Sequence, residues 1–132
     1  MAELTPAQWA DPEAVAARFV LVDTSYSAAD DPAGVAARRA FYAAPRLAED
    51  LRSSSSGAAR LQDLRRQHGV FAGEVLTVVT TERRDNLAVV AVDARLTLTS
   101  DGSAHDELRS YQLTMALDSS AGHWLVAGVE ES

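Results

Sequence analysis

The sequence contains no cysteine among its 132 residues. This excludes disulfides, thiol nucleophiles and cysteine-ligated metals, but it leaves the redox compartment open. Positive charge is also scarce, because 12 arginines and no lysine face 19 acidic residues, for a net charge of −7. Basic residues do not cluster beyond pairs such as Arg38-Arg39 and Arg65-Arg66. Because nucleic acids and anionic membrane surfaces require clustered cations, both are disfavoured as partners.

Long hydrophobic runs are absent too, since no segment approaches the ~20 apolar residues that span a bilayer. The start, MAELTPAQWADPE, is polar and acidic, unlike a signal peptide. The composition is 47% hydrophobic and 23% charged, which is typical of a globular protein. We expect this chain itself to be soluble, with residues 1–10 as an N-terminal extension or linker and residues 11–132 as a single domain.

The stretch from Leu87 to Thr99 alternates over a long distance and organises the rest of the chain. Its apolar positions fall on one face, and they are Ala88, Val90, Val92, Ala94, Leu96 and Leu98. Such period-two alternation predicts a strand with one face in the core. Val92→Asp should therefore destabilise the protein strongly, whereas Thr97→Asp, on the other face, should be mild.

The N-terminal half shows helix signals. Asp11-Pro12 and Asp31-Pro32 each combine an N-cap residue with proline at the first helical position. An apolar stripe then predicts a first helix to about Ser27, formed by Val15, Phe19, Val22 and Tyr26. The similar segments 11–18 and 31–38 are best explained as one capping device used twice, although a duplication is an alternative.

Three further helices follow from local signals. Val35, Phe41 and Tyr42 would carry the helix after Asp31-Pro32, and Pro45 would begin a short one. Ser53–Ser56 is predicted to be a loop with Ser56 as N-cap of a helix over 58–67, which Gly69 would end in the left-handed conformation.

After Gly69 the period changes to two. Strands are predicted over 74–82, 87–99, 107–117 and 123–130, joined by short polar turns. The order of elements indicates an α+β fold, with N-terminal helices packed on a curved four-stranded antiparallel sheet.

The last strand carries a family resemblance. Its pattern G-x-W-x-V-x-x-V-E comprises Gly122, Trp124, Val126, Val129 and Glu130. With the helical first half and the four strands, it resembles the nuclear transport factor two-like (cystatin-like) superfold. Within it, the chain is most similar to extracytoplasmic domains of actinobacterial type IV secretion and conjugation scaffold proteins (TcpC-type), or to Mce-associated membrane proteins of lipid importers.

The resemblance implies a non-enzymatic interaction domain, tethered outside the cytoplasm by a transmembrane helix that this chain lacks. It implies other protein subunits of a membrane complex as partners, and homo-oligomers. Two alternatives remain: an accessory domain of an Mce lipid importer, and a small isomerase- or dehydratase-type enzyme or ligand-binding protein with a pocket in the concave sheet. A superfold alone does not decide among them.

Few residues offer catalytic chemistry. Asp93 interrupts an apolar strand, but it faces away from Val92, so a solvent-facing residue paired with Arg95 or a neighbouring strand explains it better than an acid/base role. His68, His105 and His123 are widely spaced and show no metal-ligand pattern. We predict no catalytic residue, no cofactor and no metal.

The remaining candidates have structural explanations. Serines 53–56 lack the pattern of a phosphate-binding loop and are interpreted as a flexible connection. Five aromatic residues that could line a pocket are assigned to the core: Tyr26, Phe41, Tyr42, Phe71 and Trp124. Trp9 joins no apolar stripe, so we expect it to pack on a partner or on an upstream helix.

Overall fold

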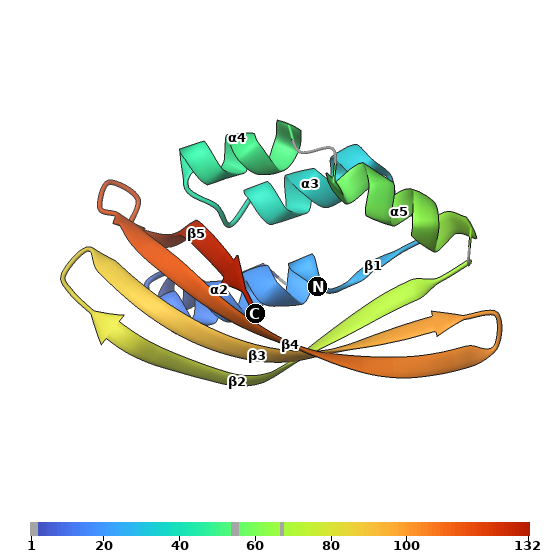
Figure 1. Ribbon diagram of the computed structural model, residues 1–132. Coiled ribbons are helices and arrows are strands. Elements are labelled where there is room, and N and C mark those ends of the chain that lie inside the picture. Colours follow the sequence, from blue (N-terminus) through green and yellow to red (C-terminus); the bar gives the residue numbers. More distant parts are fainter. Residues whose placement is uncertain (1–2, 54–55, 67) are drawn as a thin grey trace.

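A computed structural model describes residues 3–53, 56–66 and 68–132, with the backbone only for residues 56–60. Five helices lie on one face of an antiparallel sheet whose ends curl toward them (Figure 1). The helices are α1 (Pro6–Trp9), α2 (Pro12–Asp23), α3 (Pro32–Ala40), α4 (Pro45–Ser53) and α5 (Ser56–Arg66). The strands are β1 (Tyr26–Ser27), β2 (Val70–Arg83), β3 (Leu87–Ser100), β4 (Ser103–Asp118) and β5 (His123–Glu131). The α+β fold is as predicted.

The sheet has five strands in the order β1-β2-β3-β4-β5, not the predicted four. The additional strand arises because α2 ends at Asp23 and not near Ser27. The Thr24 hydroxyl bonds back to the carbonyl of Val20 at 2.7 Å, and the chain then extends so that Tyr26 pairs with Phe71. Tyr26 is buried as its place in the apolar stripe required, but on β2 and not on the helix.

Four of the described helices, α1 to α4, begin at a proline. Asp11 accepts a hydrogen bond from the Glu13 amide at 3.0 Å, and Pro12 is the first residue of α2, as predicted. Asp31 precedes Pro32 in the same way but makes no side-chain capping bond. Pro45 begins α4. The two similar segments therefore both begin helices at an Asp-Pro pair, but only Asp11 caps its helix through its side chain.

The inner face of β3 forms one side of the hydrophobic core. Five of its six predicted inner residues are nearly inaccessible to solvent, namely Ala88, Val90, Val92, Ala94 and Leu96, whereas the sixth, Leu98, is half-buried. α2 supplies most of the opposing surface through Val15, Phe19 and Val20. The strands extend beyond the predicted limits. β2 begins at Val70 and β4 at Ser103, because residues 70–73 and 103–106 also pair with β3.

The end of α5 differs from the prediction. His68, with φ of +50°, adopts the left-handed conformation assigned to Gly69. The His68 amide bonds to the Arg65 carbonyl and the Gly69 amide to the Leu64 carbonyl, which is the hydrogen-bond pattern of a Schellman motif. Glycine serves close packing at position 69, since an added Cβ would lie 3.2 Å from the Leu98 side chain.

The first and last residues of the serine run belong to two different helices. Ser53 is the last residue of α4 and Ser56 the first of α5, so Ser56 lies within the helix and not at its N-cap. The part of the predicted loop formed by residues 54–55 lies outside the described residues. Within the described ranges, no helix is both long and apolar enough to cross a bilayer.

The N-terminal residues pack on the domain. Thr5 caps α1 through a reciprocal pair of hydrogen bonds with Gln8, and Leu4 joins the main core. Trp9, expected to pack on a partner or an upstream helix, instead stacks on His123 at 4.5 Å between ring centroids and on Tyr42 at 5.7 Å. That expectation was wrong because the surface that receives Trp9 is formed by the α3–α4 connection and the start of β5, distant in the sequence.

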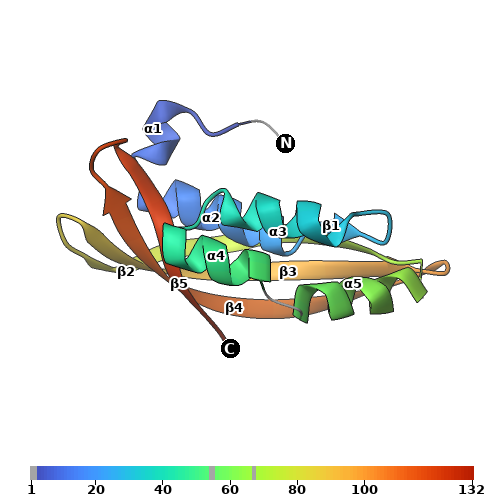
Figure 2. The ribbon, with the colours of Figure 1, turned by 90° about the horizontal axis from the view of Figure 1, so that it is seen from above.

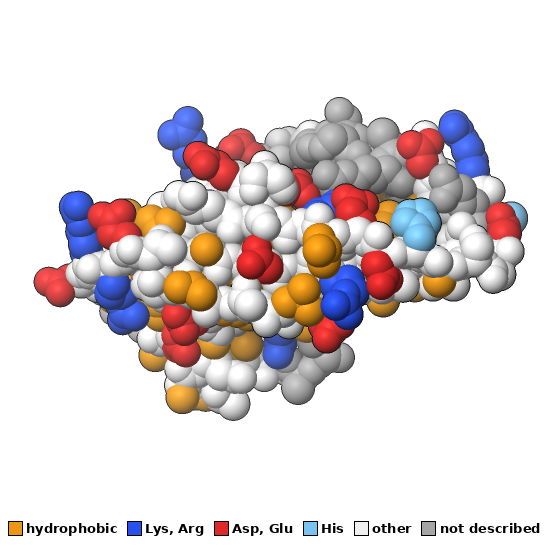
Figure 3. Space-filling view, turned by 60° about the horizontal axis from the view of Figure 1, so that its bottom comes forward, with side chains coloured by type: hydrophobic (Ala, Val, Ile, Leu, Met, Phe, Trp, Pro, Cys, Tyr) orange, Lys and Arg blue, Asp and Glu red, His pale blue; other side chains and the backbone are white. Residues whose placement is uncertain are grey.

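None of the described helices covers the outer face of the sheet (Figure 1). Apolar side chains there are interspersed with acidic and basic ones and do not form one continuous patch (Figure 3). The exposed apolar residues of this face include Leu76, Val79 and Leu108. Polar side chains on this face also bond between neighbouring strands. The Thr97 hydroxyl on β3, for example, donates a hydrogen bond to Asp106 on β4.

Candidate functional site

Asp93 lies on the outer face of the sheet, as its position in the alternation predicted. It accepts hydrogen bonds from the Ser110 hydroxyl on β4 at 2.7 Å and the Thr77 hydroxyl on β2 at 2.9 Å. The bonds from Ser110 and Thr77 hold the pKa of Asp93 below its ordinary value. The side chain therefore stays ionised and joins three strands, and it does not face the concave side where a general base would be needed.

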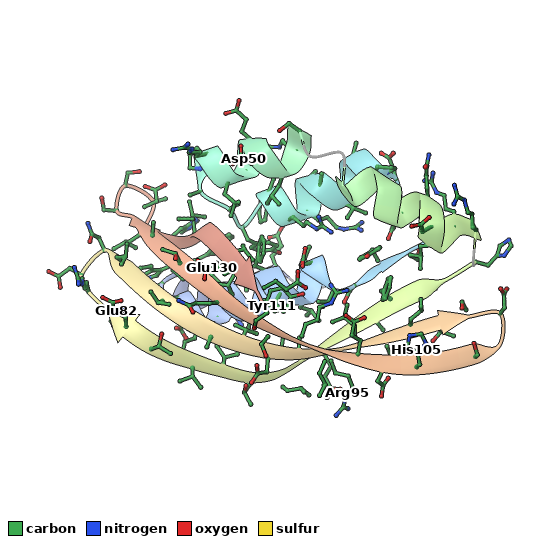
Figure 4. All side chains as sticks on the ribbon, viewed as in Figure 1. Asp50, Glu82, Arg95, His105, Tyr111 and Glu130 are labelled. Carbon is green, nitrogen blue, oxygen red and sulfur yellow. The ribbon has the colours of Figure 1, made fainter. Side chains whose placement is uncertain are left out.

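The three histidines remain apart. His68 is exposed and lies 3.8 Å from Asp101, whereas His123 is stacked on Trp9. His105 is exposed near the β3–β4 turn, far along β4 from Tyr111 (Figure 4). Among the residues that the structure describes, no three metal-ligating side chains come together.

Four of the five aromatic candidates pack as predicted. Tyr26, Tyr42 and Trp124 are buried, and Phe71 packs against Tyr26 at 5.2 Å. Phe41 is the exception, because α3 ends at Ala40 and leaves 61% of Phe41 exposed. The assignment of Phe41 to the core was therefore wrong.

A polar cluster on the concave side was not predicted. Arg39 on α3 places its Nε 2.9 Å from Oδ1 of Asp23 at the end of α2, and the pair is largely buried. The Tyr111 hydroxyl on β4 donates to Oδ2 of Asp23 at 3.3 Å. Asp23 is thus held by a cation and a hydroxyl, and Tyr111 points from the sheet toward the end of α2 (Figure 4).

The electrostatics of this cluster suit structure better than proton transfer. Burial, followed by the negative charge of Asp23, raises the pKa of Tyr111 well above its usual range. Arg109, next to Tyr111 and ion-paired to Glu131 at 3.3 Å, has its pKa raised by hydrogen bonds to Glu107 and Tyr111 even though burial alone would lower it. Both shifts move Tyr111 and Arg109 further from titration near neutral pH, so neither is suited to exchange a proton there.

A half-open cavity of about 230 Å³ lies between the ends of α2 and α3. Its lining consists of Val22, Ser25, Arg38, Phe41 and Tyr42. Arg38 is already paired with Asp30 at 3.3 Å, and none of these residues is a carboxylate or a histidine. The cavity is smaller than the ~300–1,000 Å³ of ordinary small-molecule sites, and it offers space for an apolar group.

The edge formed by β2 is protected. β1 pairs with its first residues, Val70 and Phe71. Further along, the Gly73 amide donates to the Ser25 hydroxyl at 3.1 Å, and the Thr80 amide donates to Glu13 at 3.0 Å. Side chains at both ends of α2 thus occupy backbone donors that would otherwise pair with another strand.

The edge formed by β5 is protected only in its first half. The Val126 amide donates to the Tyr42 carbonyl at 2.9 Å, and the Ala44 amide donates to the Val126 carbonyl at 2.7 Å. This short parallel bridge ends at Pro45, which has no amide hydrogen and begins α4. Residues Ala127 to Glu131 extend beyond it and are mostly exposed.

Several solved structures have a fold similar to that of this chain. An IcmL-like type IV secretion system protein from Legionella pneumophila has a TM-score of 0.77 at 7% identity, over 99% of this chain and 94% of that one. CagV, a VirB8 homologue of the Helicobacter pylori type IV secretion system, gives 0.66 at 8%, over 91% and 95%. Agrobacterium tumefaciens VirB8 gives 0.63 at 16%, over 100% and 96%.

At these identities the likeness shows the fold alone, and it confirms the predicted arrangement of helices on a curved antiparallel sheet. No protein-family model and no curated protein matches the sequence.

Proposed function

We propose that this chain is a non-enzymatic interaction domain of a type IV secretion or conjugative transfer apparatus. In the full-length protein it would lie outside the cytoplasm, attached to the membrane by an N-terminal helix. The observation that carries the proposal is the likeness over nearly the whole chain to two structures whose names place them in type IV secretion, and to VirB8, of which one of those two is a homologue. The actinobacterial setting that the sequence resemblance implies is part of the same proposal.

The geometry supports an assembly role over catalysis. Asp23 is paired with Arg39 and accepts a hydrogen bond from Tyr111, and Asp93 faces outward. One edge of the sheet remains partly open, and apolar residues such as Leu108 are exposed on its outer face. An open edge of this kind is a feature through which proteins bind an extended segment of another chain.

The decisive experiment uses the protein in its native cells. We expect the protein in the membrane fraction, an intact mass that includes a hydrophobic N-terminal segment, and cross-links to other subunits of the transfer apparatus. Deleting the gene should abolish DNA or protein transfer. A soluble species that begins at Met1 and whose deletion leaves transfer unchanged would contradict the proposal.

A matched variant separates assembly from catalysis. Tyr111→Phe keeps the packing of the ring but removes the hydroxyl that contacts Asp23. We expect it to restore transfer to the deleted strain at the wild-type level, because an assembly role does not use this hydroxyl. Loss of transfer with normal protein abundance and normal cross-linking would indicate chemistry at this cluster.

Self-association is part of the proposal. Leu76, Val79 and Leu108 leave apolar surface on the outer face of the sheet, which a second copy could cover. Sedimentation over a range of concentrations should show a reversible oligomer, and a strict monomer at high concentration would contradict this part.

A further inference from the structure

The direction of the backbone groups along β5 can be derived from three hydrogen bonds. Both groups of Val126 point away from β4, toward Tyr42 and Ala44, whereas the Ser132 amide points inward to the Ser110 carbonyl at 2.9 Å. These directions alternate along an antiparallel strand.

A register shift between Val126 and Gly128 interrupts this alternation. The backbone directions in the C-terminal half of β5 are therefore counted back from Ser132. The backbone amides and carbonyls of Gly128 and Glu130 point toward β4, and those of Val129 and Glu131 point away from it.

This outward row is open. Within the described part of the chain, no hydrogen bond is formed by the backbone of Val129 or Glu131 on the side away from β4. The bridging segment that ends at Ala44 stops just before this row. The C-terminal end of β5 also extends past α4 to the rim of the molecule (Figure 2). An added strand would therefore continue the edge where the bridging segment leaves it.

Charge decides what kind of strand fits. Glu130 is exposed, and Glu131 is its neighbour on a protein of net charge −7. Two copies pairing their β5 edges about a two-fold axis at this position would bring Glu130 opposite its own copy, and like charges directly opposite are destabilising. A basic strand would instead place a cation beside Glu130.

We propose that the outward backbone of Ala127–Glu131, the β5 edge, pairs with an extended basic segment of another protein. The identification of that protein as a further subunit of the transfer apparatus rests on the proposed function, whereas the pairing chemistry rests on the edge itself. Main-chain hydrogen bonds to Val129 and Glu131 supply the pairing, and Glu130 selects for lysine or arginine.

The test titrates the isotopically labelled chain with a short blocked peptide of alternating lysine and valine, followed by NMR. The amides of Val129 and Glu131 should shift, and a glutamate–valine peptide should bind at least about ten-fold more weakly. Val129→Pro removes one outward donor without removing a bond to β4, so it should lose the binding, whereas Val129→Ala, which keeps the donor, should retain it.

Charge is tested by a matched pair. Glu130→Lys should weaken the lysine peptide at least about ten-fold, while Asp85→Lys, the same charge change in the β2–β3 turn, should have little effect. Far-ultraviolet circular dichroism and melting confirm that each variant is folded. If Val129→Pro misfolds, the Glu130→Lys variant and the map of shifted amides still test whether the peptide pairs with the β5 edge. Equal binding by both peptides, or shifts outside β5, would overturn the proposal.

The two proposals fail in different ways. If the peptide does not bind but cross-links to transfer subunits persist in cells, the β5 edge is wrong and the proposed function stands. If the peptide binds at β5 but transfer and cross-linking do not involve the protein, the edge binds basic segments in some other assembly.

Discussion

The two edges of the sheet, β2 and β5, are protected to different extents. Along β2, α2 lies close enough for Ser25 and Glu13 to accept hydrogen bonds from edge amides, and β1 pairs with the beginning of the strand. Along β5, a bridging segment protects Val126 but ends where Pro45 begins α4. One edge is closed by the domain itself, and half of the other is left to solvent or to a partner.

The difference teaches that edge protection here depends on helix placement more than on strand composition. β2 carries a row of β-branched residues that would suit pairing with another strand, and the domain covers it. The open part of β5 instead carries Gly128, Glu130 and Glu131, which discourage pairing with a second copy. An edge that is open yet acidic is suited to a selected partner.

The largest expected effect concerns β3, the strand to which both edges are joined. Val92 is 1% exposed, so Val92→Asp places an unpaired charge in the core and should lower the free energy of unfolding by at least about 3 kcal/mol. Thr99→Asp, exposed on the same strand, should lower it by less than about 0.5 kcal/mol. Urea denaturation measures both, and equal losses would mean that the faces are assigned wrongly.

The structure revises the comparison that the sequence suggested. Thr97 was expected to tolerate aspartate, but its hydroxyl donates to Asp106 at 2.7 Å. Thr97→Asp would set two carboxylates against each other and should cost about 1 kcal/mol. Thr99 is therefore the better control.

The next-largest expected change in the free energy of unfolding comes from a glycine on β2, and a glycine on β5 provides the comparison. A Cβ at Gly73 would overlap the Thr24 hydroxyl and lie 2.6 Å from the Thr24 Cβ, whereas a Cβ at Gly128 meets only Thr114, at 3.7 Å. Gly73→Ala should lower the free energy of unfolding by about 2 kcal/mol or more, because α2 must move away from β2. Gly128→Ala should change it by less than about 0.5 kcal/mol. Similar losses in both variants would remove the distinction between a closed and an open edge.

Sequence periodicity was sufficient for the elements whose burial is continuous. β3 could be predicted because Ala88 to Leu96 alternate without interruption, and α2 because Asp11 and Pro12 mark its start. The end of α2 could not, since Tyr26 is buried in either conformation and the choice depends on Phe71, far along the chain. β1 escaped prediction for the same reason, because two residues carry no period.

The candidate site was harder to predict because it is formed by contacts distant in sequence. Asp23, Arg39 and Tyr111 meet only when α2, α3 and β4 are assembled, and each residue alone resembles an ordinary surface or core residue. The outward position of Asp93 followed directly from alternation. The open β5 edge depends on where the bridging segment ends, and Pro45 is the only local signal of that.

A smaller effect tests the cap on the closed edge. Glu13 accepts hydrogen bonds from both the amide and the hydroxyl of Thr80, at 3.0 and 2.6 Å. Glu13→Ala removes both acceptors and should lower the free energy of unfolding by about 1 kcal/mol. Glu130→Ala on the open edge removes no such bond and should change it by less than about 0.5 kcal/mol. If chemical denaturation shows no difference between the two, α2 does not protect β2 in the way described.

The smallest effect concerns Asp93, which joins the strands between the two edges. Its pKa is lowered by the hydroxyls of Ser110 and Thr77, below the 3.8 of a free aspartate. A carboxyl whose folded-state pKa is depressed contributes stability that is present above the unfolded pKa and is lost as the pH falls through the folded value. The free energy of unfolding should therefore decline with acidification below about pH 4, and Asp93→Asn should make this decline shallower.

Asp118 gives the internal comparison for that measurement, because hydrogen bonds from Ser120 lower its pKa within the β4–β5 turn. Asp118→Asn should also flatten the acid limb, and the double variant should show the sum of the two changes, since the residues share no partner. Denaturation curves collected from neutral pH into the acid limb decide the question. An Asp93→Asn variant with the wild-type pH dependence would show that the bonds from Ser110 and Thr77 do not stabilise the ionised carboxylate, and the link between the closed and open sides of the sheet would then rest on the backbone ladder alone.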